Sequence, residues 1–209
     1  MNGKVVVNEL IFDFASGILG PAKSLFASSY LQLNSNASRV GSTFENMLGE
    51  NLMDNENINP KYLKYTDCIN AANTKSASNL KDPLTSFFGN LNDLNWKQVY
   101  KGFKEFTPSI DDKDELKLIK MDPGVTVPLH SHGGKEFILV LEGSFCDEYG
   151  EYAMGDIQIN DQKIKHTPIA SKDTGCVCMS ITEKDVIFFG KFGSFLNLFT
   201  FIKSFFKQK

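Results

Sequence analysis

Three histidines and one glutamate stand at a spacing that suits a metal ion. His130 and His132 are two residues apart, so both imidazole rings would point to the same face of a β-strand. The two glycines that follow permit a sharp turn, which would bring the carboxylate of Glu136 back towards the rings. His166 comes 30 residues later, beyond an expected hairpin, on a segment that can face the same cavity. Three neutral imidazole nitrogens and one carboxylate oxygen suit Zn, Fe(II), Mn or Ni and leave coordination positions open.

A single histidine is more often a surface residue or a hydrogen-bonded core residue than a metal ligand. Here the chain has three histidines in 209 residues, and all three fall in one pattern with a carboxylate at a matching offset. The sequence therefore predicts one divalent metal ion per chain, held by His130, His132, Glu136 and His166.

Two further groups of side chains have types that could do chemistry. Cys176 and Cys178 would share one face of another strand, either as redox-active thiols near the metal or as small buried apolar side chains. Between the ligand segments lies an acidic hairpin with Glu142, Asp147 and Glu148. We expect these carboxylates to be solvated in a turn rather than to act as a general acid or base.

Composition narrows the function classes. Lys and Arg number 22 against 25 Asp and Glu, the net charge is −3, and Arg39 is the single arginine. Proteins that read nucleic acids usually have a basic surplus and several arginines, so we expect no direct nucleic-acid contact. Four cysteines are too few for a disulfide framework. No segment has the pattern of a secretory signal or an uninterrupted apolar run of about 18 residues, so we expect a cytoplasmic protein without a transmembrane span.

The first quarter of the chain predicts a small helical module over residues 1–54. Apolar residues recur at helical spacing as far as Ile18, and Gly20-Pro21 separates the first helix from the second. Ser35 and Asn36 are the residues expected to cap a third helix.

The rest of the chain has three parts of different composition. Residues 55–92 contain many Asn and Ser and indicate a linker. Over 93–190, short apolar runs separated by Gly, Pro, Asn and Asp predict the strands of a sandwich or barrel. Residues 191–209 predict an amphipathic helix that docks on the barrel or a dimer interface, with a membrane surface as the alternative.

The metal-site segment resembles the first cupin motif, Gly-x5-His-x-His-x3-Glu-x6-Gly, at every fixed position from Gly124 to Gly143. More narrowly, the sequence is similar to the ChrR-like cupins. The segments that carry this likeness are 130–136, 141–148, 150–152, 155–156, 166–168 and 175–178. In that family a C-terminal cupin follows a small helical anti-sigma domain. The resemblance therefore implies an α+β chain, with an all-β cupin jelly-roll barrel at the C-terminal side of a helical anti-sigma-like module.

The resemblance also implies roles. His130, His132, Glu136 and His166 look like the cupin metal ligands, with zinc as the metal of the family's anti-sigma members and Fe(II) or Mn as alternatives. The helical domain of those proteins binds a group IV sigma factor and keeps it from RNA polymerase. Their cupin domain is needed for release under oxidative stress, which implies a role in transcription regulation.

One part of the family pattern is missing. The helical domain of the family carries its own zinc, held by an upstream His and a His-x3-Cys-x2-Cys element. The aligned positions here are Tyr30, Asn34 and Ala37, so we expect this module to be stabilised by helix packing instead of zinc.

Two functions of different class stay open. The first is a metal-binding anti-sigma factor whose cupin domain senses an oxidant or small ligand. The second is a metal-dependent cupin dioxygenase, because the same ligand set around Fe(II) is also found in small cupin dioxygenases. A non-catalytic ligand-binding cupin is a third, weaker hypothesis. Since cupins of this kind often dimerise through the barrel, we also expect a homodimer.

Overall fold

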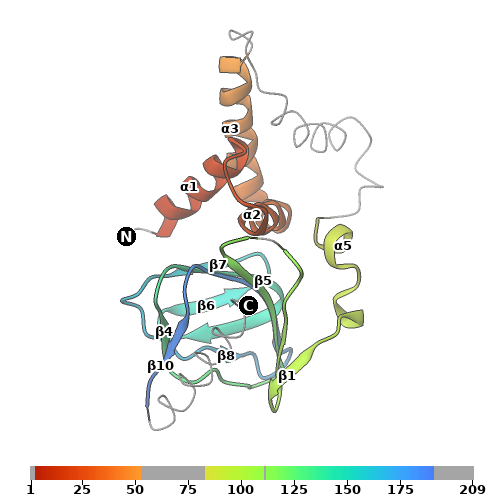
Figure 1. Ribbon diagram of the computed structural model, residues 1–209, viewed down its shortest axis with the longest axis vertical. Helices are drawn as coiled ribbons and strands as arrows, with labels where there is room; N and C mark the ends of the chain where they lie inside the picture. Colours follow the sequence, from red (N-terminus) through yellow and green to blue (C-terminus); the bar gives the residue numbers. More distant parts are fainter. Residues whose placement is uncertain (1–2, 53–82, 111, 191–209) are drawn as a thin grey trace. The chain divides into compact units, whose positions relative to one another are not determined.

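The structure is a computed structural model that describes residues 3–52, 83–110 and 112–190 (Figure 1). The chain falls into two units, Met1–Leu94 and Asn95–Lys209. The helix predicted over 191–209 lies outside the described residues, as does most of the predicted linker. The described remainder of that linker forms helix α5 (Pro83–Phe88), which packs against α2, and the 3-10 turn η1 (Leu91–Asp93).

The first unit contains the three expected helices, α1 (Gly3–Ala15), α2 (Pro21–Leu33) and α3 (Ser35–Leu52). Helix α1 ends before Ile18 because the chain turns at Gly17, which has a positive φ of 70° that favours glycine. The prediction that the first helix extends as far as Ile18 is therefore wrong, and the side chain of Ile18 is exposed. Helix α2 begins at Pro21, as predicted.

One asparagine organises the junction between α2 and α3. The backbone N–H of Asn34 donates to the carbonyl of Tyr30 at 2.9 Å, which closes α2. Its side-chain oxygen accepts the N–H of Ala37 at 3.0 Å, which caps the start of α3. The prediction that Ser35 and Asn36 cap this helix is wrong, because they are its first two residues and the cap is Asn34. Tyr30 and Ala37 are both buried.

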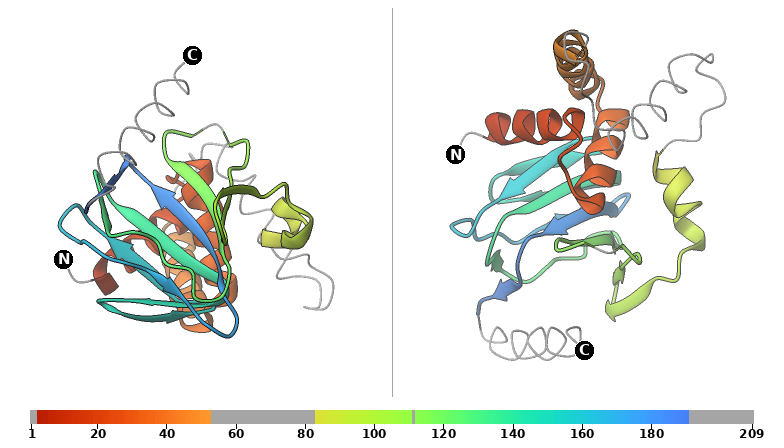
Figure 2. Two further views of the ribbon diagram at one scale, coloured as in Figure 1. Left: turned by 90° about the horizontal axis from the view of Figure 1, so that it is seen from below. Right: turned by 45° about the horizontal axis from the view of Figure 1, so that its top comes forward.

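The second unit is a curved antiparallel β-domain, which Figure 2 shows from two sides. Its longest strand is β5 (Glu136–Asp147). The first part of β5 lies between β7 and β9, and its last part pairs with β6 and β8. The other strands are β1 (Lys97–Tyr100), β2 (Phe103–Phe106), β3 (Glu115–Met121), β4 (His130–His132), β6 (Gly150–Ala153), β7 (Ile157–Asn160), β8 (Ile169–Ala170), β9 (Cys176–Thr182) and β10 (Val186–Phe188).

Strand β5 changes direction at Gly143. The pairing with β9 shifts register between Val140 and Glu142, and Gly143 follows with a positive φ of 67°. A Cβ atom on Gly143 would lie 2.2 Å from the carbonyl oxygen of Gly175, the residue before β9, so a glycine is required at this position. Residues 136–141 are all buried, as expected for a strand covered on both faces.

The interior of the β-domain has an apolar part and a polar part. The apolar part is a cluster of seven buried residues: Met121, Ile138, Val140, Phe145, Ala170, Cys176 and Cys178. The polar part contains the three histidines with Glu136, Gln158, Asn160 and Ser180, all of them buried. Buried polar groups need partners, so this second part is where chemistry is expected.

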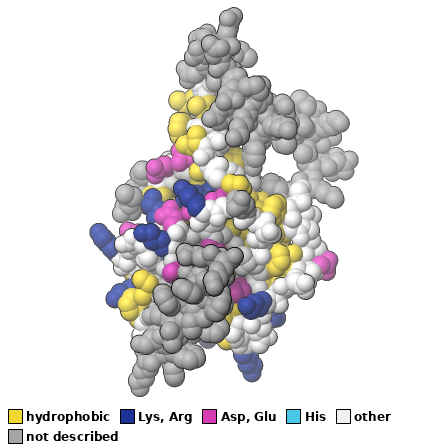
Figure 3. Space-filling view, viewed as in Figure 1, with side chains coloured by type: hydrophobic (Ala, Val, Ile, Leu, Met, Phe, Trp, Pro, Cys, Tyr) yellow, Lys and Arg dark blue, Asp and Glu magenta, His cyan; other side chains and the backbone are white. Residues whose placement is uncertain are grey.

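Two observations concern the surface of the described residues. None of their helices is long and apolar enough to cross a membrane. On the face drawn in Figure 3, basic and acidic side chains of the described residues are interspersed.

Candidate metal centre

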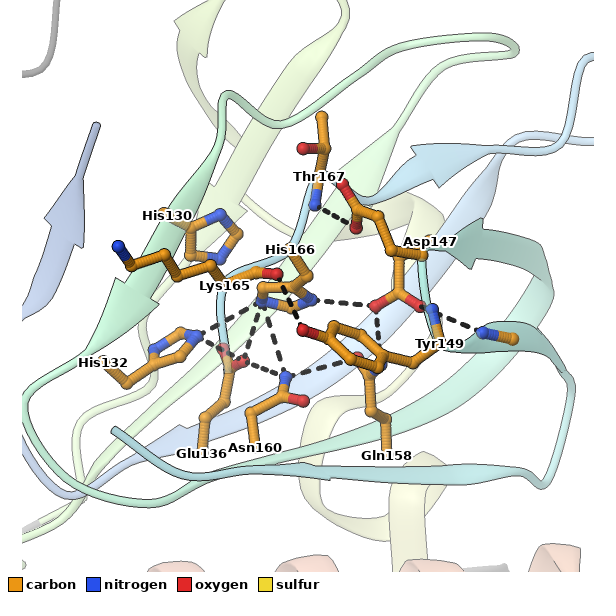
Figure 4. Close-up of polar contacts among 12 residues, drawn as sticks. His130, His132, Glu136, Asp147, Tyr149, Gln158, Asn160, Lys165, His166 and Thr167 are labelled. Carbon is orange, nitrogen blue, oxygen red and sulfur yellow. Dashed lines mark hydrogen bonds and ion pairs between the residues drawn. The ribbon is translucent and has the colours of Figure 1, made fainter. Parts of the chain in front are cut away.

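The structure brings His130, His132, Glu136 and His166 together, and one donor atom from each lies within 4.8 Å of the others. His130 and His132 form the two ends of β4, and Glu136 begins β5 after the Gly133-Gly134 turn. The segment of His166 is held beside β4 by two backbone hydrogen bonds between His130 and His166, of 3.1 and 3.0 Å. All four residues are at most 5% exposed, and Figure 4 shows their side chains converging.

The spacing of the donor atoms fits a shared ion. Nε2 of His132 lies 2.9 Å from Oε2 of Glu136 and 3.3 Å from Nε2 of His166. Nε2 of His166 lies 3.9 Å from the same carboxylate oxygen. Two ligand atoms that each stand about 2.1 Å from one ion are about 3.0–3.4 Å apart. The separations around Nε2 of His132 therefore match one shared ion, and the wider separations among the four donors, up to 4.8 Å, must shorten when an ion binds.

Hydrogen bonds at the far nitrogen set the tautomer of two rings. Nδ1–H of His130 donates to the carbonyl of Pro128 at 2.9 Å, and Nδ1–H of His166 donates to Oδ2 of Asp147, also at 2.9 Å. Each bond leaves Nε2 as the nitrogen with a free lone pair, which is the form that binds metals. Nδ1 of His132 is buried and has no hydrogen-bond partner among the described residues.

The charges also suit a cation. Burial, together with the neighbouring His166, lowers the pKa of His130 to about 4, so this ring is neutral at pH 7. Burial acts to raise the pKa of Glu136, but the hydrogen bond and charge of His132 outweigh it and hold that pKa at about 2. The carboxylate also accepts hydrogen bonds from Asn160 Nδ2 and Ser180 Oγ, each 3.1 Å long. A charged carboxylate among imidazoles is the donor set that a divalent transition metal prefers.

Several residues around the ligands were not expected from the sequence. Asp147 was expected to be solvated in a turn, and this is wrong, because its side chain is buried against His166. Gln158 and Asn160 alternate with two isoleucines along β7, so both amides face the interior. That alternation was the one signal in the sequence that could have placed them at the site.

The two cysteines belong to the apolar part of the interior. Cys176 and Cys178 are buried on β9, and their sulfur atoms are 3.2 Å apart. The hydrogen bond to Cys176 and the burial of the thiol raise the pKa of Cys178 well above its usual value. Since the thiolate is the reactive form, this environment favours the packing alternative over a reactive redox thiol.

A curved antiparallel β-domain whose interior gathers three histidines and a glutamate defines a cupin. Residues 86–184 match the family model of the ChrR cupin-like domain. The anti-sigma-E factor ChrR of Cereibacter sphaeroides is 34% identical over 115 residues, which are 54% of this chain and 52% of that protein. The chain thus spans about half the length of this curated relative.

A solved structure resembles more of the chain. It is the crystal structure of Rhodobacter sphaeroides SigE in complex with the anti-sigma ChrR. The match has a TM-score of 0.69 at 26% identity and covers 84% of this chain and 96% of that chain. The fold class expected from the sequence, a helical module followed by a cupin, is confirmed.

Proposed function

We propose that the protein is a metal-binding anti-sigma factor. In this proposal the helical unit binds a group IV sigma factor, and the β-domain carries one metal ion and responds to oxidative stress. The observation that supports it best is the extent of the likeness to the SigE–ChrR structure. That likeness covers 84% of the chain, whereas residues 95–209 are only 115 of 209, so it includes the helical unit as well as the cupin.

The helical unit can support this role without a zinc ion. At the positions where the resemblance implies zinc ligands, the side chains of Tyr30 and Ala37 are buried and Asn34 caps α3. A helix cap of this kind typically stabilises a fold by about 1 kcal/mol. Packing and capping thus take over the part that a structural metal would play. Because sigma factors act on RNA polymerase, we place the protein in the cytoplasm.

The metal centre would tie three segments of the β-domain together. His130 and His132 come from β4, Glu136 from β5 and His166 from the segment before β8, and each would supply one donor atom. When bound, a divalent ion supplies a positive charge that neutralises the buried carboxylate and cross-links these segments. We propose zinc, with Fe(II) or Mn as the alternatives that metal analysis must exclude.

Sigma binding can be tested directly with the full chain. The tagged protein is co-expressed with each group IV sigma factor encoded in the same genome, and the purified material is examined for a retained sigma factor. We expect one of them to co-purify at equal stoichiometry and its transcription in vitro to be inhibited. If none is retained and none is inhibited at micromolar concentration, the protein is not an anti-sigma factor.

Metal identification separates this proposal from the enzymatic hypothesis. Protein purified without oxygen and without chelator is expected to contain about one zinc ion per chain. Iron together with oxygen uptake on a β-diketone or thiol, abolished by His132→Ala, would instead establish a dioxygenase. The homodimer expected from the sequence is measured on the same sample by light scattering.

A further inference from the structure

The carboxylate of Asp147 receives four hydrogen bonds inside the β-domain, as Figure 4 shows in part. Its Oδ2 accepts Nδ1–H of His166 at 2.9 Å and Nε2–H of Gln158 at 2.7 Å. Its Oδ1 accepts the backbone N–H groups of Tyr149 at 2.8 Å and Gly150 at 3.2 Å. Asp147 is the last residue of β5, so one buried side chain joins the β5–β6 turn to a candidate metal ligand.

A second path leads from the same carboxylate to another ligand. The side-chain oxygen of Gln158 accepts Nδ2–H of Asn160 at 3.3 Å. The same amide nitrogen donates to Oε2 of Glu136 at 3.1 Å. Asp147 therefore contacts His166 directly and reaches Glu136 through two buried amides, whose orientation it fixes.

We propose that Asp147 is a positioning residue for the metal centre. It keeps His166 in the Nδ1–H tautomer, so that Nε2 presents its lone pair to the ion, and it links the exposed β5–β6 turn to the site. The inference rests on the metal centre of the proposed function and does not depend on sigma binding. Metal-bound histidines usually donate their other N–H to such a carboxylate or carbonyl, and losing that partner typically lowers metal affinity 10–100-fold.

An asparagine of the same shape cannot replace this carboxylate, because it has one acceptor oxygen while four donors surround the site. If its amide group faces His166, the ring must accept at Nδ1 and carry its proton on Nε2, where it blocks the metal. If its oxygen faces His166, the amide group meets the two N–H groups of Tyr149 and Gly150 and the turn loses both hydrogen bonds. Each orientation therefore breaks either the contact with His166 or the hydrogen bonds of the turn. Because asparagine has nearly the volume of aspartate, Asp147→Asn tests the effect of the carboxylate charge without a change in side-chain size.

The chain offers a matched control. Asp156 lies in the turn before β7, its side chain is exposed, and its Oδ2 accepts the N–H of Ala153 at 2.9 Å. Asp156→Asn makes the same substitution and the same charge change in a neighbouring turn. No hydrogen bond joins Asp156 to the candidate ligands within the described part of the chain.

The tautomer can be measured without a metal, because the chain has only three histidines. The full-length protein is labelled with ¹⁵N-histidine, and the ring nitrogens are recorded in metal-free protein at mildly alkaline pH. We expect His166 to carry its proton on Nδ1 in the wild type and in Asp156→Asn, and to shift towards the Nε2–H tautomer in Asp147→Asn. An Nε2–H tautomer of His166 in the wild type overturns the inference, even if the variant does not fold.

Zinc affinity is measured on the same three proteins by competition with a chromophoric chelator. We expect Asp147→Asn to bind zinc about 10–100-fold more weakly than the wild type, and Asp156→Asn to bind like the wild type. An unchanged tautomer and affinity in folded Asp147→Asn refutes the positioning role. If the tautomer and affinity behave as expected but no sigma factor is retained, the proposed function fails and this inference stands.

Discussion

Acidifying the metal-free protein from pH 7.5 to 4.5 should destabilise the β-domain through His130. Burial lowers the pKa of this ring from 6.5 to about 4 in the folded protein, whereas in the unfolded chain it stays near 6.5. Between these values the unfolded state binds a proton that the folded state does not. Stability therefore falls as the pH falls through this window. Glu136, whose folded pKa is held at about 2, adds to the loss only below its usual value of 4.5.

The size of the effect follows from the pKa shift. One pKa unit is worth about 1.4 kcal/mol, and at pH 4.5 most of the shift of His130 is expressed, which gives roughly 2–3 kcal/mol. His130 is 5% exposed, so solvent screens little of this. The urea midpoint should move down by on the order of 1 M, given typical urea dependences for small domains.

Urea unfolding followed by tryptophan fluorescence measures this change in the second structural unit, Asn95–Lys209, which contains His130. Trp96 is the single tryptophan and precedes β1. The centre of its ring lies 6.4 Å from the centre of the Phe106 ring, in an edge-on arrangement. His130→Gln is the matched variant and should lose most of the decrease between the two pH values. An equal urea midpoint at pH 7.5 and 4.5, or an equal decrease in the variant, would show that His130 is not the buried titrating group.

Three other outcomes are expected from the described contacts. Removing the metal with a chelator should lower the thermal midpoint of the β-domain. A free ion at a concentration of 100 times its Kd adds about 2.7 kcal/mol to the free energy of unfolding, so an unchanged midpoint on calorimetry argues against a structural ion. Asn34→Ala should cost the helical unit about 1 kcal/mol in urea unfolding followed by circular dichroism, while Asn34→Asp should cost little, and equal losses would contradict the capping role. Gly143→Ala should destabilise the β-domain far more than Gly190→Ala. Both glycines have a positive φ, which costs an alanine about 1–2 kcal/mol, but of the two only Gly143 would bring its new Cβ atom against a backbone oxygen.

The metal ligands could be predicted because their pattern is local. His130, His132 and Glu136 lie within seven residues, and strand parity with a glycine turn was enough to place them together. His166 was placed by its spacing and by the scarcity of histidine. The ends of helices were less predictable, since Gly17 and Asn34 decide them through backbone geometry that apolar spacing does not encode.

The supporting residues could not be predicted in the same way. Asp147 is part of an acidic hairpin, and its neighbours Glu142 and Glu148 are indeed exposed. What buries Asp147 is the bend at Gly143, which turns the end of β5 back towards His166, and this bend depends on contacts with a distant strand. Ser180 reaches Glu136 across a strand pairing separated by 44 residues, which no local pattern reveals.

Both ends of β5 meet at one imidazole ring. Glu136 at its start lies 3.9 Å from Nε2 of His166, and Asp147 at its end lies 2.9 Å from Nδ1 of the same ring. A straight strand of this length would hold its ends about 36 Å apart. The His166 ring is therefore enclosed only after β5 has curved completely. In a partly folded chain this ring would lack one or both of its carboxylate partners. Metal loading should accordingly be a late event in the maturation of the protein, and it would distinguish finished molecules from incomplete ones.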